Sequence, residues 1–165
     1  MINKQLFSLA EQTVSNLKQK NLSVSTAESC TGGLVSAYIT SVSGVSQIFE
    51  MGITSYSCRI KNEKLGVKSE TLEKHGAVSS DTAKEMAEGI RKLSGSDIGV
   101  SVTGVAGPDP SEGHPPGYVF IALSAKDKLI TELLNIEPLS RDYVREKATE
   151  SIFNLINNYI KESKI

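Results

Sequence analysis

Residues 27–33 read Ala27-Glu28-Ser29-Cys30-Thr31-Gly32-Gly33, and they join an apolar, β-branched run at 22–26 to a helical pattern at 31–41. Such a junction predicts a strand that feeds a helix. In an open α/β sheet, ligands and catalytic groups collect at the carboxyl ends of strands, and a helix N-terminus offers unpaired N–H groups to negative charge. Ser29 stands at this junction, where it is either a helix cap or a nucleophile.

The rest of the chain alternates between helical and strand-like patterns. Apolar spacing predicts helices over 3–20, from Ser69 to His75, after Ser80, and after Ser140, where the serine can act as a cap. Strands are expected at 51–57, 97–103, 118–124 and 129–136, and the last two form a hairpin. The polar residues 58–64 are expected to be a connection. The pattern therefore predicts an α/β protein with a mixed sheet.

Composition excludes several classes of protein. A chain of 165 residues fits one domain, over 1–165, and its formal net charge of −1 gives no footprint for nucleic acid or an anionic membrane. Two cysteines without a CxxC pair argue against a disulfide scaffold or a structural zinc site. The N-terminus shows neither a signal peptide nor a membrane span. We expect a cytoplasmic protein.

A serine nucleophile needs a base, and the sequence offers few. The two histidines, His75 and His114, fall at a helix end and in a proline-rich loop, where each is equally well a cap or a solvated side chain. Lys61 is the other candidate base. Lowering a lysine pKa from about 10.4 to about 7 or 8 costs roughly 4 kcal/mol, which burial and a nearby guanidinium can supply. Otherwise Lys61 is a solvated lysine in a polar connection.

A second strand-to-loop junction follows the 97–103 run. Its sequence is Thr103-Gly104-Val105-Ala106-Gly107-Pro108, which lacks the Gly-Lys-Ser/Thr ending of a Walker loop. The backbone N–H groups and the Thr103 hydroxyl could bind a phosphate or another substrate group, and a tight structural turn is equally plausible. The proline-rich residues 109–116 should form a surface loop, and such loops often border sites.

Read together, these stretches are much more specific than each is alone. In order and spacing they resemble the CinA C-terminal-domain family, also called nicotinamide-nucleotide amidohydrolases, and the resemblance covers nearly the whole chain. The resemblance does not include the long N-terminal domain of full-length members, and we expect a stand-alone form. The matching residues are Ala27 to Gly33, Tyr56 and Lys61 with Leu65-Gly66-Val67, His75 to Ser79, Thr103 to Pro108, and Arg141 to Arg145.

The resemblance implies a three-layer α/β/α sandwich with a mixed, mostly parallel sheet of about five strands. It also implies hydrolysis of nicotinamide mononucleotide to nicotinate mononucleotide and ammonia, in pyridine-nucleotide salvage, without a metal or cofactor. Ser29 would be the nucleophile, Lys61 the base, and Arg145, or else Arg141, would tune Lys61 or hold substrate. N–H groups at the start of the following helix would stabilise the oxyanion. The expected substrate-binding residues are Thr31, Gly32, Gly33, Tyr56, Thr103, Gly104, Gly107 and Arg141, and self-association into a homo-oligomer is expected.

Two departures from the family pattern fall at the rim of the expected site. Members commonly carry Asn where this chain has Cys58, and Lys-Pro-Val-Gly-Thr where it has the run from His114 to Tyr118. Two rival functions stay open. One is a non-catalytic nucleotide-binding or partner-docking module, and the other is a hydrolase whose nucleophile is Cys30, assisted by His75.

Overall fold

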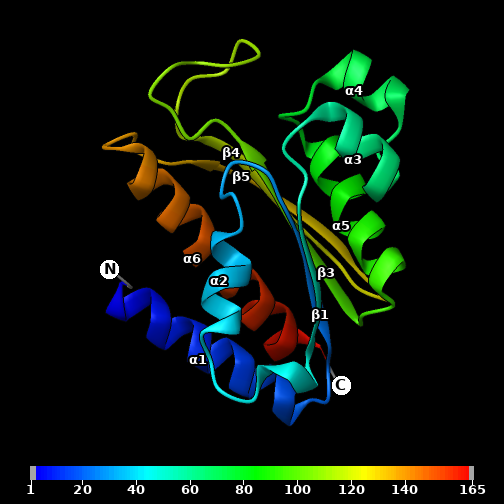
Figure 1. Ribbon diagram of the computed structural model, residues 1–165, viewed down its shortest axis with the longest axis vertical. Coiled ribbons are helices and arrows are strands. Elements are labelled where there is room, and N and C mark those ends of the chain that lie inside the picture. Colours follow the sequence, from blue (N-terminus) through cyan, green and yellow to red (C-terminus); the bar gives the residue numbers. More distant parts are fainter. Residues whose placement is uncertain (1–2, 164–165) are drawn as a thin grey trace.

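A computed structural model describes residues 3–163 and contains one five-stranded sheet in the order β2-β1-β3-β4-β5 (Figure 1). Strand β1 pairs in parallel with β2 and β3, whereas β4 is antiparallel to β3 and to β5. Four strands therefore run in one direction and β4 runs against them. The strands are β1 (Val24–Glu28), β2 (Phe49–Thr54), β3 (Ile98–Gly104), β4 (Tyr118–Ser124) and β5 (Leu129–Asn135).

Helices cover both faces of this sheet (Figure 1). On one face lie α1 (Lys4–Gln19), α2 (Leu34–Thr40) and α6 (Arg141–Glu162), and a 3₁₀ turn, η1 (Val45–Gln47), precedes β2. On the other face lie α3 (Cys58–Leu65), α4 (Ser69–His75) and α5 (Ser80–Ser94). The predicted three-layer α/β/α sandwich with a mixed, mostly parallel sheet is confirmed. No helix within residues 3–163 is long and apolar enough to cross a membrane.

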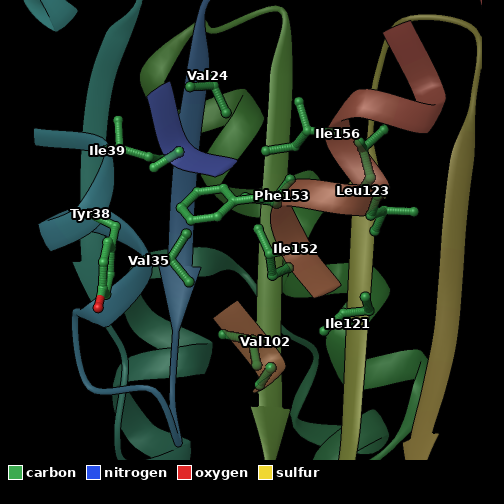
Figure 2. Close-up of a cluster of buried hydrophobic side chains, with 14 of the residues drawn as sticks. Val24, Val35, Tyr38, Ile39, Val102, Ile121, Leu123, Ile152, Phe153 and Ile156 are labelled. Atoms are coloured by element: carbon green, nitrogen blue, oxygen red, sulfur yellow. The ribbon is translucent and has the colours of Figure 1, made fainter. Parts of the chain in front are cut away.

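The larger hydrophobic core lies between the sheet and the α1, α2 and α6 layer. Figure 2 shows Val35 and Ile39 of α2 with Ile152 and Phe153 of α6 facing the strands. Val35 and Ile39 are four residues apart, as are Ile152 and Ile156, so each helix buries a continuous apolar stripe. A smaller cluster on the opposite face joins β1 to α3 and α5, and it consists of Ala27, Leu65, Val67, Met86 and Ile90.

Strand β1 lies between β2 and β3 in the sheet and is buried along its whole length. Because side chains alternate across a strand, neighbouring residues serve opposite layers. Thr26 and Glu28 bond to Ser36 of α2, whereas Ala27 packs in the cluster with α3 and α5. Ser29 is two residues after Ala27 and therefore lies on the same side of the strand, so its side chain faces α3.

Residues 58–64 were expected to be a connection, and this expectation is wrong because they form α3. Ser57 caps the helix by accepting a hydrogen bond from the Ile60 N–H at 3.3 Å, and Gly66 ends it with a φ of 70°. Only Lys61 and Leu65 are buried in this helix. A polar helix with one buried lysine offers no apolar period, so its sequence resembles a loop.

The boundaries around Ser29 also differ from the expectation. Strand β1 continues to Glu28 instead of ending at residue 26, and α2 begins at Leu34 instead of Thr31. Gly32 and Gly33 adopt positive φ angles of 61° and 95°, which a right-handed helix does not allow. Ser29 therefore sits in a turn between the strand and the helix.

Candidate active site

A pocket of about 210 Å³ opens at the carboxyl ends of β1 and β3 and contains Ser29. Its walls come from five parts of the chain: the turn after β1, residues 56–61, the α4–α5 connection, the loop after β3, and the start of α6. Of the expected site residues, it brings together Ser29, Tyr56, Lys61, Thr103, Gly104, Gly107 and Arg141. A broader hollow at the opposite end of the sheet contains none of them.

Ser29 and Lys61 are in direct contact inside this pocket. The Lys61 Nζ atom lies 3.0 Å from Ser29 Oγ and donates to the Ser55 carbonyl oxygen at 2.7 Å and to the Tyr56 carbonyl oxygen at 3.5 Å. Lys61 is only 1% exposed. With two N–H bonds directed at carbonyl oxygens, a neutral amine can turn its lone pair to the Ser29 hydroxyl.

Burial favours the neutral form of Lys61. It lowers the lysine pKa from the ordinary 10.5, because an ammonium loses hydration in the protein interior. Acidic groups nearby act in the other direction: the Glu112 carboxylate, and Cys58 and Cys30 where they are ionised, each tend to raise the pKa of Lys61. No arginine is among these causes, and the expected tuning of Lys61 by a guanidinium stays a prediction.

The two arginines hold backbone and side-chain oxygens instead. Arg145 donates through Nε and Nη2 to the Thr31 carbonyl oxygen at 3.2 and 2.9 Å, which fixes the turn after Ser29. Arg141 donates to the Gly107 carbonyl oxygen at 2.6 Å and to the Tyr56 hydroxyl at 3.0 Å. Arg141 lines the pocket, and Arg145 supports it from behind the turn.

Glu28 is a residue whose importance the sequence reasoning missed. Its carboxylate is 1% exposed and accepts from the hydroxyls of Thr31 and Ser36 at 2.6 and 2.7 Å. It also accepts from the N–H groups of Gly33, Val35 and Ser36 at 3.0, 3.1 and 2.9 Å. These N–H groups at the start of α2 were expected to serve an oxyanion, and Glu28 already occupies them. The one available signal was a carboxylate ending a buried strand just before a Thr-Gly-Gly turn.

The expected substrate-binding residues fall into two groups, those that line the pocket and those that do not. Thr31, Gly32 and Gly33 form the turn behind Ser29 and do not line the pocket. Thr103 does line it, and its hydroxyl donates to the Ala77 carbonyl oxygen at 2.7 Å, which joins the end of β3 to the α4–α5 connection. Tyr56 contributes an exposed ring whose hydroxyl Arg141 holds.

Cys30 lines the pocket, whereas His75 and His114 do not. Burial raises the pKa of the Cys30 thiol to about 12, so at neutral pH this residue is a thiol and not a thiolate. His75 faces Asp81 with its Nε2 atom 3.7 Å from a carboxylate oxygen, and it lies outside the pocket lining. His114 stacks on Tyr118 with 4.3 Å between the ring centres. Within residues 3–163, no cluster of His, Cys, Asp and Glu is suited to hold a metal ion.

The buried Glu28 network predicts a large loss of stability in Glu28→Gln. The amide nitrogen would face N–H and hydroxyl donors, so at least one buried donor would lose its acceptor, and we expect a loss of about 3 kcal/mol in the free energy of unfolding. Urea denaturation measures this loss. Glu50→Gln makes the same change at an exposed position of β2 and should leave stability within about 0.5 kcal/mol. Equal stability of the two variants would contradict the network's role.

The fold and the pocket define an α/β/α protein that holds a buried lysine against a serine at the carboxyl edge of its sheet. The model of the CinA C-terminal domain family matches residues 6–160, so the chain belongs to this family. The predicted resemblance is therefore confirmed.

Relatives with curated names extend this result. A protein of Bacillus velezensis named "Putative competence-damage inducible protein" is 49% identical over 149 residues, which are 90% of this chain and 36% of that protein. A protein of Acetivibrio thermocellus with the same name is 47% identical over 150 residues, again 90% of this chain and 36% of that protein. The chain thus spans little more than a third of the length of these relatives.

Solved structures show the same fold over nearly the whole chain. The competence/damage inducible protein CihA from Agrobacterium tumefaciens is 31% identical, with a TM-score of 0.93 over 98% of this chain and 99% of that one. A competence or damage-inducible protein from Enterobacter asburiae is 30% identical, with a TM-score of 0.91 over 96% of this chain and 99% of that one.

Proposed function

We propose that this chain is a serine amidohydrolase that converts nicotinamide mononucleotide into nicotinate mononucleotide and ammonia. The observation that carries the proposal is the contact of 3.0 Å between Ser29 Oγ and the Nζ atom of a lysine that is 1% exposed. A serine hydroxyl becomes a useful nucleophile only beside a base, and a buried lysine with a lowered pKa is such a base.

The geometry supports a two-step reaction. Ser29 Oγ attacks the carboxamide carbon while Lys61 Nζ takes the hydroxyl proton, and the resulting ammonium then gives this proton to the amide nitrogen, which leaves as ammonia as the C–N bond breaks. Lys61 next takes a proton from water, the water oxygen attacks the acyl-enzyme carbonyl, and the proton returns to Ser29 Oγ as the ester bond breaks and the carboxylic acid is released. The N–H group of Cys30 directly follows the nucleophile in the pocket wall and is a candidate donor to the oxyanion.

The remainder of the pocket suits a substrate with an anionic group. The two hydrogen bonds of Arg141 go to neutral oxygens, so its guanidinium keeps its full charge for a phosphate, which it can bind through two N–H groups. A volume of about 210 Å³ suits the ring and its amide rather than the whole nucleotide. The phosphate would then extend to Arg141 at the pocket edge.

The proposal is tested by mixing the purified protein with nicotinamide mononucleotide, without added metal, and measuring ammonia and nicotinate mononucleotide. We expect equal amounts of the two products. Free nicotinamide, which has the amide but no phosphate, should react much more slowly. If the mononucleotide raises the melting temperature but no product forms, the chain is a binding module and the proposed function is wrong.

The rival nucleophile is tested by Cys30→Ala and a matched Cys58→Ala variant. Because the buried Cys30 thiol stays protonated at neutral pH, we expect Cys30→Ala to keep kcat/KM for nicotinamide mononucleotide within about fivefold of the parent, a cost of about 1 kcal/mol from altered packing. Steady-state kinetics at pH 7.5 measures this. A loss above a hundredfold in a folded Cys30→Ala protein would assign the nucleophile to the thiol.

A further inference from the structure

Beside the buried Lys61 amine, three charged side chains line the pocket around Ser29, and none of them forms an ion pair within residues 3–163. They are Asp109, Glu112 and Arg141. Elsewhere in the same part of the chain, seven ion pairs of lysine or arginine with a carboxylate form. A pocket that keeps unpaired charges of both signs is complementary to a ligand that carries both signs.

The two signs lie on different walls. Arg141 stands at the start of α6, on the side of Gly107 and Tyr56. Glu112 reaches the α4–α5 connection, where it accepts from the Val78 N–H at 3.1 Å. Figure 1 shows the start of α6 and the α4 region on opposite sides of the end of β1. The pocket is therefore positive toward α6 and negative toward α4.

The negative charge lines the same pocket as Ser29 and Lys61. The Glu112 carboxylate also opposes the effect of burial on the pKa of Lys61, as the smallest of the causes that act on it, and burial still lowers that pKa. Paired backbone hydrogen bonds between Ser111 and His114, at 3.1 and 2.9 Å, fix the loop tip that carries it. Asp109 lies in the same loop and its carboxylate makes no hydrogen bond within the described part of the chain.

We propose that Glu112, assisted by Asp109, makes the pocket select a carboxamide on a cationic ring, such as a pyridinium, over the same carboxamide on a neutral ring. This inference rests on the proposed amidohydrolase function. With the amide carbon at Ser29, the attached ring lies in the pocket within reach of the acidic loop. A cationic ring gains from the Glu112 and Asp109 carboxylates, and a neutral ring gains nothing for displacing their water.

The test compares nicotinamide mononucleotide with its 1,4-dihydro form, which has the same amide, ribose and phosphate on an uncharged ring. We expect Glu112→Gln to lower kcat/KM for the cationic substrate by about fivefold, the size of one partly screened ion pair, and to leave the value for the neutral one unchanged. Asp109→Asn should act in the same direction. The intrinsic reactivities of the two rings cancel because the ratio of the substrates is compared between proteins.

Glu132→Gln on β5 removes the same charge at an exposed position outside the pocket, and it should change neither rate. An equal fall for both substrates in Glu112→Gln would show that Glu112 only holds the Val78 segment, and it would overturn the inference. Dissociation constants from calorimetry separate this failure from that of the proposed function. A parent protein that turns over neither substrate but binds the cationic ligand more tightly, with the preference lost in Glu112→Gln, contradicts the reaction and supports the selectivity.

Discussion

Ser29→Ala is expected to lower ammonia release from nicotinamide mononucleotide by about 10³-fold or more, since loss of the nucleophile removes the acyl-enzyme route. The substitution deletes one oxygen atom from a half-buried residue in a turn. The turn itself rests on the Glu28 carboxylate and on Arg145, so the fold should survive. Single-turnover assays at high enzyme concentration measure the loss of activity.

Two controls, a binding measurement and a matched serine variant, separate loss of the nucleophile from other effects of the substitution. The Ser29→Ala protein should still bind the mononucleotide, because Arg141 and Tyr56 are untouched, and calorimetry tests this. Ser41→Ala changes an exposed serine at the end of α2 and should retain the parent rate. Full activity in a folded Ser29→Ala protein would refute the assignment of the nucleophile.

The fold was predictable where one face of an element is apolar. The hairpin of β4 and β5 and the start of α6 after Ser140 lie where the sequence indicates. The α3 helix was missed because its buried residues are a lysine and one leucine, a pattern without an apolar period. A buried polar residue such as Lys61 breaks the apolar period on which such predictions depend.

The sequence, through its resemblance to a family, points to Ser29, Lys61 and Arg141. These residues line one pocket, and their catalytic and binding roles stay predictions from the sequence. The sequence does not reveal that Glu28 occupies the start of α2, because that carboxylate acts through backbone N–H groups that no residue type encodes. Self-association, a cytoplasmic location and the lack of nucleic-acid partners stay predictions from the sequence.

The alternation of side chains along β1 determines where the acidic Glu28 and its neighbour Ser29 point. Glu28 points to α2, where its carboxylate stabilises the turn. Ser29 points to α3, where its hydroxyl contacts Lys61. A shift of one residue in the strand would exchange them and bury the serine under α2. The pairing of β1 with β2 and β3 therefore determines which residue the pocket receives.

Lys61→Met is expected to abolish activity to a similar degree, about 10³-fold, while leaving the protein nearly as stable as the parent. Methionine fills similar volume without a group that can accept the Ser29 proton. The loss of the bond to the Ser55 carbonyl oxygen costs on the order of 1 kcal/mol, and removal of a buried amine offsets it. Product assays with urea denaturation measure both effects, and Lys64→Met, exposed on the same helix, is the matched control.

The direction in which kcat/KM changes with pH distinguishes a Lys61 that acts as a base from a Lys61 that only supports the site. The parent kcat/KM should rise with pH and level off below 10.5, because only the neutral amine accepts the Ser29 proton and burial lowers the pKa of Lys61. Stability should rise over the window between that lowered pKa and 10.5, since there the unfolded chain binds more protons than the folded one. Lys61→Met removes this rise in stability. A parent rate that falls as pH increases from 6 to 9, at constant fold, would mean that the reaction needs the ammonium, and Lys61 would then not be the base.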